Sequence, residues 1–234
     1  GFIPWDDDID LYMPRKDYDR LMTLAGEFQA PYFLQTSYSE KNMLRGYARL
    51  RNSLTTGASV VEQHRPINKG LFIDICPIDG ISENKKLDKK QLKKHKYYRW
   101  VFGVYNATRS PRPGMNRLQK IKQIVTGQLA DILVGNKEKF FRKYEANLKK
   151  YSIPSTKLWG NRTLVFECPK SRRPIEDYTD LVMMPFEFIE VPVPRNYDSM
   201  LRQQYGDYMK IPENKNGSMH GELIISTDYA YDDP

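Results

Sequence analysis

The chain has 234 residues, 40% of them hydrophobic, which is enough to bury a sizeable core without disulfides or a structural metal. Its two cysteines, Cys76 and Cys168, form no CxxC pair, which argues against a disulfide framework or a thiolate zinc site and fits a reducing compartment. The formal net charge of +8 draws the protein toward polyanions such as nucleic acid, anionic lipid or nucleotide phosphates, without choosing among them. No apolar run approaches the length needed to cross a bilayer.

The first part of the chain alternates strands and helices. Alternation of polar and apolar residues predicts a strand over 8–13, ended by Pro14, and helical spacing predicts a helix over 19–27 with a cap at Asp17. Further strands are expected over 32–36, 43–52 and 71–75. Pro77 and the Asp79-Gly80 pair predict a turn that ends the last of these strands.

The middle of the chain is helical and basic. Helices are expected over 87–106, 118–132 and 137–151, and the second carries an apolar face. That face consists of Leu118, Ile121, Val125, Leu129 and Ile132. The surplus of lysines lies in 85–96 and 137–150, where a solvated helix face is the default and a binding patch is the alternative.

The last third turns to short strands and turns, rich in proline and aromatic residues. A short helix is expected over 197–205, ended by Gly206, and the tail from Ile211 reads as a loop. The sequence shows no internal repeat and no low-complexity linker. We therefore expect one domain over 1–234, with a helical insertion over about 85–151.

Acidic residues cluster near the start of the chain. On a strand, residues two apart point the same way, so Asp8 and Asp10 are expected to present two carboxylates on one face, and Asp6 extends that row if the strand begins early. Asp74 stands alone in an apolar run and is the natural third acid from a neighbouring strand, because a buried carboxylate needs a partner. Such a group of carboxylates suits a divalent cation and phosphoryl or nucleotidyl transfer. The alternative is an acidic turn before a solvent-facing strand, with Asp74 paired to an arginine.

Four segments resemble the LicD family of phosphotransferases, which is related to the fukutin proteins. The first is Gly1–Asp10 followed by Met13-Pro14-Arg15, with the sequence GFIPWDDDID. The others are Arg49–Asn52, Gly70–Gly80 and Tyr205–Met209. These matches are spread over nearly the whole chain, and the middle helices are its least characteristic part.

The resemblance implies an α+β protein: a nucleotidyltransferase-like mixed β-sheet flanked by helices, with an added helical lobe. It also implies transfer of a phospho-substituent from a cytidine diphosphate donor to a sugar hydroxyl. The best known bacterial case moves phosphocholine from CDP-choline onto teichoic acid or lipopolysaccharide sugars, in cell wall biogenesis. CMP is then the product, and the acceptor hydroxyl attacks the phosphorus that carries choline.

Site residues follow from the same resemblance. Asp8, Asp10 and Asp74 would be catalytic and would hold Mg²⁺ or Mn²⁺, with Asp6 a weaker addition and Asp74 a candidate proton acceptor. Family members carry a helix and a Gly-rich loop before the Pro-Trp-Asp run, which would cradle donor phosphates. Nothing precedes Gly1 here, so we expect the natural chain to extend further.

Three other residues are candidates for substrate binding. Arg49 and Arg51, two apart on a strand, are expected to face the site and clamp phosphate, although a structural ion pair with the acids is the alternative for one of them. His220 lies in a glycine-flanked loop where the family tends to carry a histidine, and a bland surface position is equally open.

The expected partners are a CDP-activated donor, CDP-choline first, and a glycan acceptor that could be lipid-linked. The basic surface suits peripheral contact with an anionic membrane, so we expect a cytoplasmic protein at the inner membrane face, and we expect no nucleic acid. Two other functions stay open. One is an ordinary nucleotidyltransferase that attacks the α-phosphate, and the other is a non-catalytic basic module that binds nucleic acid or anionic membrane through its helices.

Overall fold

The centre of the molecule is a mixed six-stranded sheet. The structure, a computed structural model, describes residues 2–6, 8–59, 62–110, 114–151, 155–163, 170, 172–211 and 223–233. The strand order is β2-β3-β5-β6-β7, and β1 pairs with β5. These strands are β1 (Asp10–Pro14), β2 (Tyr32–Gln35), β3 (Ala48–Asn52), β5 (Leu71–Ile81), β6 (Leu158–Asn161) and β7 (Arg173–Pro174). The β1–β5 pair is parallel and the others are antiparallel, so the mixed sheet and the α+β class are confirmed.

The long strand β5 is the spine of this sheet. It pairs with β3 through its first five residues, with β1 through its middle (74–78) and with β6 through its last four residues. The predicted turn at Pro77 and Gly80 is therefore wrong. Pro77 lies in the strand opposite Met13, and Gly80 lies in it opposite Trp159. Because only alternate residues of a strand donate to a given neighbour, Pro77 removes at most one hydrogen bond from the ladder.

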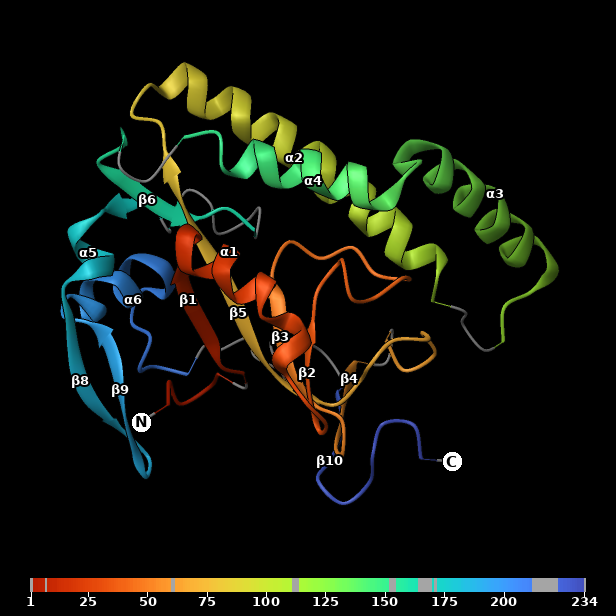
Figure 1. Cartoon of the computed structure of the whole chain (residues 1–234), viewed down its shortest axis with the longest axis horizontal. Helices are drawn as coiled ribbons and strands as arrows, with labels where there is room; N and C mark the ends of the chain where they lie inside the picture. Colours follow the sequence, from red (N-terminus) through yellow and green to blue (C-terminus); the bar gives the residue numbers. More distant parts are fainter. Residues whose placement is uncertain are drawn as a thin grey trace.

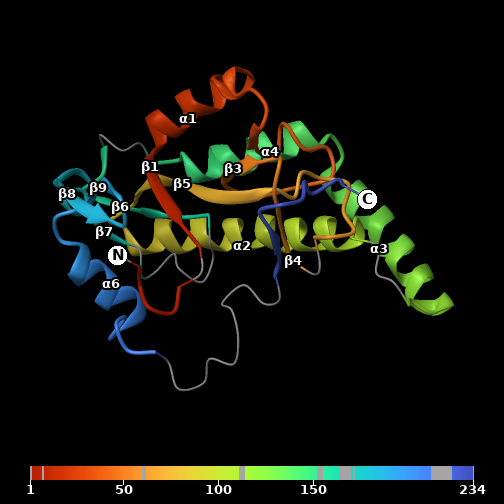
Figure 2. The ribbon, with the colours of Figure 1, turned by 90° about the horizontal axis from the view of Figure 1, so that it is seen from below.

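Helix α1 (Arg15–Thr23) covers one face of the sheet (Figure 2). It begins directly after Pro14, four residues earlier than predicted, and ends before the short 3₁₀ helix η1 (Ala25–Glu27). The core beneath α1 consists of Tyr18, Leu34, Ala48 and Ile75, with Met13, Leu21, Met22, Ala25, Phe28 and Leu50 packed against it. Because strand side chains alternate between faces, Asp74, next to Ile75, points to the opposite face.

Three helices form a lobe beside the sheet, which we call the helical lobe (residues 85–151; Figure 1). They are α2 (Lys85–Thr108), α3 (Arg117–Val134) and α4 (Lys137–Leu148), and each begins at an asparagine whose side chain accepts backbone N–H bonds. The lobe has its own core, rich in aromatic residues: Leu44, Tyr98, Val101, Phe102, Tyr105, Ala130, Val134, Phe140, Phe141, Tyr144 and Leu148. Leu44 comes from the loop between β2 and β3, which ties the lobe to the sheet.

The described residues from 172 to 211 pack at the other end of the sheet (Figure 1). They contain α5 (Glu176–Thr179), the hairpin of β8 (Leu181–Phe186) and β9 (Ile189–Pro194), and α6 (Tyr197–Tyr205). Helix α6 ends at Gly206, as predicted, with a positive φ of 76° that favours glycine. The tail is not only loop, because β10 (Leu223–Ser226) pairs with β4 (Thr56–Ser59). Among the described residues, no helix combines the length and apolar character that crossing a membrane needs.

Candidate active site

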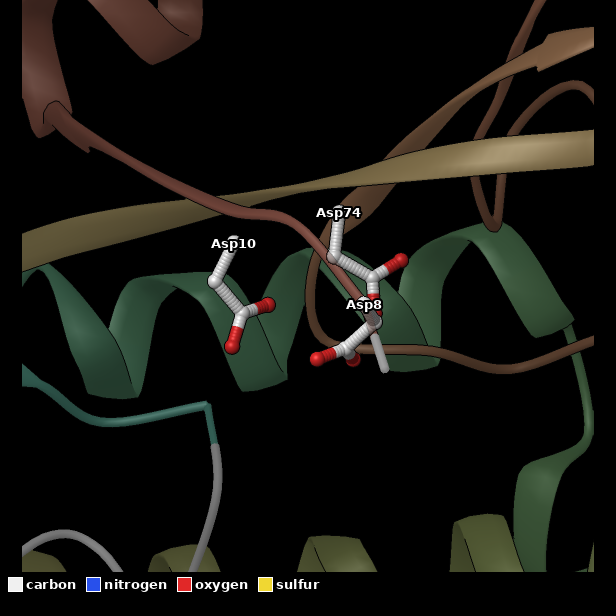
Figure 3. A group of neighbouring side chains, drawn as sticks. All are labelled: Asp8, Asp10 and Asp74. Atoms are coloured by element: carbon white, nitrogen blue, oxygen red, sulfur yellow. The ribbon is translucent and has the colours of Figure 1, made fainter. Parts of the chain in front are cut away.

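Three carboxylates meet on the face of the sheet that α1 leaves uncovered. Asp10 opens β1 and lies directly opposite Asp74 of β5 in the parallel register. Asp8 lies in the bend before β1, so it is not a strand residue as predicted, but the Asp74 N–H donates to the Ile9 carbonyl at 3.0 Å and holds this segment beside β5. One oxygen from each of the three carboxylates lies within 4.8 Å of the other two (Figure 3). The three predicted acids are thus brought together.

Asp74 is also paired with an arginine. Arg49, opposite Asp74 on β3, donates from Nε to Oδ1 at 2.6 Å and from Nη2 to Oδ2 at 3.4 Å. Its guanidinium stacks over Phe72 at 3.6 Å from the ring centroid. Burial is the largest single effect and lowers the pKa of Arg49, but the charges of Asp74, Tyr47 and Glu62 and the hydrogen bond to Asp74 together outweigh it and hold this pKa above its usual value. The carboxylate cluster and the arginine pair, stated above as alternatives for Asp74, therefore occur together in one geometry.

A buried charge network backs this pair. Glu62 accepts a bond from Arg45 at 2.7 Å and lies 3.7 Å from Arg49. Burial raises the pKa of Glu62, but Arg45, Arg49 and Arg51 together bring it down to about 2. Arg49 therefore has two carboxylate partners, Glu62 and Asp74. Because Glu62 helps to fix Arg49, the position of Asp74 depends on residues outside the cluster.

Arg51 lies in the interior and has no described bond to the acids. Its side chain is fully buried, and it donates to Gln35 Oε1 at 2.7 Å and to the Gly70 carbonyl at 2.6 Å. Burial and the neighbouring arginines lower its pKa to about 9. A Cβ at Gly70 would stand 2.0 Å from the Asn52 carbonyl oxygen, so this close backbone approach requires glycine. Contact of Arg51 with a substrate phosphate stays a prediction.

Two predicted site residues remain, Asp6 and His220. Asp6 is half-buried and its N–H donates to the Ile3 carbonyl in a turn, and it does not belong to the group of three. His220 lies outside the described residues.

Two side-chain pairs outside the cluster were missed by sequence reasoning. Arg15 makes a buried two-bond pair with Asp79, with both distances 2.7 Å, and fixes the start of α1 to β5. Trp5 packs edge-on against Tyr205, with 5.5 Å between the ring centroids, which joins the N-terminal segment to the last residue of α6. Both pairs join residues far apart in sequence. The only signal for them was their presence in the matched segments.

A mixed sheet that presents three clustered carboxylates has the donor set of a divalent metal site of the kind used in phosphoryl transfer. Residues 1–104 match the sequence profile described as the LicD/FKTN/FKRP nucleotidyltransferase domain, so the resemblance to the LicD family is confirmed. The chain is also 27% identical, over 94% of its length and 80% of the relative's, to the lipopolysaccharide cholinephosphotransferase LicD of Haemophilus influenzae. No solved structure matches the chain.

Proposed function

We propose that this protein transfers phosphocholine from CDP-choline to a sugar hydroxyl of a cell-surface glycan, lipopolysaccharide or teichoic acid, and releases CMP. The observation that carries the proposal is the grouping of Asp8, Asp10 and Asp74 within 4.8 Å, in a chain that matches a cholinephosphotransferase over 94% of its length. The proposal includes a nucleotidyltransferase-like sheet, Mg²⁺ or Mn²⁺ as cofactor, and a cytoplasmic site at the inner membrane face.

The three carboxylates fit a hard divalent cation. All the donors are oxygens, and their mutual repulsion at this distance is relieved by a divalent charge. Ligand oxygens on one octahedral Mg²⁺ lie at most about 4.2 Å apart, twice the bond length. The three carboxylate oxygens lie within 4.8 Å of one another, so a small rotation of the exposed Asp10 side chain is enough to bring them within this limit. When bound, the cation supplies charge stabilisation for the phosphates of the donor.

In the reaction, the acceptor hydroxyl oxygen forms a bond to the phosphorus that carries choline. The bond between that phosphorus and the bridging oxygen breaks, and CMP leaves with the electron pair. Arg49 donates hydrogen bonds to both carboxylate oxygens of Asp74. This carboxylate is therefore better suited to anchoring the cluster than to accepting the hydroxyl proton. Asp8 and Asp10, less buried than Asp74, are the carboxylates that we propose accept it.

An aromatic pair offers a place for the choline group. Trp5 lies three residues before Asp8 and packs against Tyr205, and both are half-buried. A quaternary ammonium binds over aromatic faces. We therefore expect Trp5→Ala to raise KM for CDP-choline more than KM for CDP-glycerol. An equal rise for both donors would assign Trp5 a structural role only.

The test measures CMP release from CDP-choline with Mg²⁺ and a GalNAc-containing acceptor. Asp10→Asn is expected to lower the rate at least about a hundredfold, as loss of a metal ligand or its support does. It should also weaken Mn²⁺ binding measured by titration calorimetry, a readout independent of turnover. Asp232→Asn, at an exposed position remote in sequence, serves as the matched control. Full activity of Asp10→Asn would overturn the metal site, and activity with CDP-glycerol or CDP-ribitol alone would change the cargo.

A second candidate is nucleotidyl transfer, favoured by the description of the profile that matches residues 1–104. In that reaction the acceptor attacks the α-phosphate of a nucleoside triphosphate and pyrophosphate leaves. Chromatography of the products separates the two functions, since CMP appears in one and pyrophosphate in the other.

A further inference from the structure

Helix α3 has two opposite faces, and one of them packs on the end of α2. Gln123 donates from Nε2 to the Ser110 carbonyl at 3.1 Å, and a Cβ at Gly127 would lie 3.5 Å from Thr108. Further along the same face, Ala130 and Val134 are buried in the core of the lobe. This contact fixes α3 in orientation, so its outer face is defined by the fold.

The outer face of α3 is apolar. Its residues recur at helical spacing and are between 48% and 78% exposed. We call them the α3 stripe: Leu118, Ile121, Val125, Leu129 and Ile132. At roughly 100° per residue, the centre of the stripe lies roughly 160° from the centre of the packed face. Among the described residues nothing covers it, and α3 lies at the outer end of the lobe, away from the sheet (Figures 1 and 2).

Basic side chains border the stripe on both sides. Arg117 and Lys122 are exposed and lie roughly 80° and 60° from its centre on an ideal helix. Asp131 is the single acidic residue of α3, and it is paired with Arg109. The lobe as a whole, residues 85–151, holds 19 Lys and Arg against four Asp and Glu, a net charge of +15 within a chain of +8. The rest of the chain is therefore net acidic, and the positive charge of the protein belongs to the lobe.

We propose that the α3 stripe inserts into the interfacial region of an anionic lipid bilayer, with the surrounding lysines and arginines on the lipid headgroups. A helix with one apolar face and a basic border lies in the plane of a membrane interface in this way. The proposal rests on the geometry and charge of the lobe and does not depend on the reaction proposed above.

The main competing occupant of the stripe is a second copy of this chain. Two stripes packed together would bring the basic borders of two lobes, each of net charge +15, into contact. Such a contact sets like charges against each other, whereas anionic headgroups are complementary to them. Charge complementarity therefore selects the lipid surface.

The test uses the whole protein in a vesicle flotation assay at physiological salt. The protein should float with vesicles of phosphatidylethanolamine and phosphatidylglycerol and stay behind with vesicles of phosphatidylcholine alone. The variant Leu118→Gln/Val125→Gln/Ile132→Gln should lower the partition coefficient at least about tenfold, because it removes three apolar contacts from an exposed face. Arg117→Gln/Lys122→Gln should lower it about fivefold per residue removed.

A matched control removes three exposed apolar side chains elsewhere, in Leu54→Gln/Ile211→Gln/Ile225→Gln, and should float like the unaltered protein. Failure of the unaltered protein to float with the anionic vesicles would overturn the proposal. So would equal flotation of the stripe variant and the control. A concentration-dependent dimer, seen by light scattering and lost only in the stripe variant, would assign the stripe to a second copy instead. Since flotation needs no donor or acceptor, these outcomes are independent of the transferase activity.

Discussion

The sheet and the helical lobe place their charges in opposite ways. The sheet buries ionic side chains: Arg15, Arg45, Arg49, Arg51, Asp74 and Asp79 are all less than 10% exposed. The lobe buries aromatic rings and holds its seven α2 lysines at the surface. Buried ions are costly unless paired, so each one fixes its partner in place. The difference shows that the sheet holds its charged side chains in fixed positions, while the lobe leaves its charge exposed at the surface.

This contrast implies different sensitivities to mutation. In the sheet, loss of one charged partner leaves the other charge buried and unpaired in a low-dielectric environment. In the lobe, loss of a surface charge changes binding and leaves folding nearly unchanged. Four predictions test this contrast: two concern buried charges in the sheet, and two concern the helical lobe.

The largest effect is expected at the Arg15–Asp79 pair of the sheet. Asp79→Asn leaves Arg15 buried without its counter-charge and should lower the free energy of unfolding by about 3–5 kcal/mol. Urea denaturation followed by circular dichroism measures this loss. The double variant Arg15→Met/Asp79→Leu should recover most of it, because it removes both charges together. A small loss for Asp79→Asn alone would mean that the pair is solvated in solution.

The next effect concerns a buried histidine in the lobe. His95 is almost fully buried, and neither ring nitrogen has a hydrogen-bond partner within the described part of the chain. Burial, then the charges of Arg99 and Arg162, lower its pKa from 6.5 to about 3. The folded state thus disfavours the protonated form, and stability falls as pH falls below 6.5, by about 3 kcal/mol at pH 4.5.

His95→Phe should remove this pH dependence between pH 6.5 and 4.5, measured as the unfolding free energy in urea at each pH. The exposed His64 provides the control, since His64→Phe should leave the dependence in place. Parallel pH curves for His95→Phe and the unaltered protein would contradict the burial of His95.

The sheet should respond to acid in a lower window. The pKa of Glu62 is depressed from 4.5 to about 2 by its arginine neighbours, so its stabilising charge is fully present above 4.5 and is lost as pH falls toward 2. Glu62→Gln should therefore lower the unfolding free energy at pH 7, and the difference from the unaltered protein should shrink by about 2 kcal/mol between pH 7 and 3. Thermal unfolding at each pH measures it. A constant difference across this range would show that Glu62 acts through shape and not through charge.

The grouping of the three carboxylates could be predicted from the sequence better than the faces of the elements. Asp8, Asp10 and Asp74 could be grouped because alternation within a strand and isolation in an apolar run are local signals. The pairing of Arg15 with Asp79 joins residues 64 apart, and no local period reports it. Strand β5 was predicted too short because proline and glycine weaken a strand only where their donors or side chains are needed.

The α3 stripe is a second example of a tertiary contact that local sequence does not report. Periodicity correctly located the helix from its apolar positions, but a period identifies a face without identifying what covers it. In α3 the neighbour α2 takes the opposite face, where Gln123 and Gly127 make the contact. The packed face is thus the more polar and smaller of the two, and this tertiary contact cannot be seen in the local sequence.

The smallest effect on stability is therefore expected at the stripe itself. Leu118→Gln/Val125→Gln/Ile132→Gln should change the free energy of unfolding by no more than about 0.5 kcal/mol per residue, because these side chains are exposed in the folded state. Ala130→Gln, on the packed face of the same helix, should cost about 1–3 kcal/mol by overpacking the core of the lobe. Urea titrations of the two variants side by side compare the two faces directly. If the stripe variant were the less stable of the two, the stripe would be covered in the free protein, and the lobe would follow the rule of the sheet, with its functional residues held inside a packed structure.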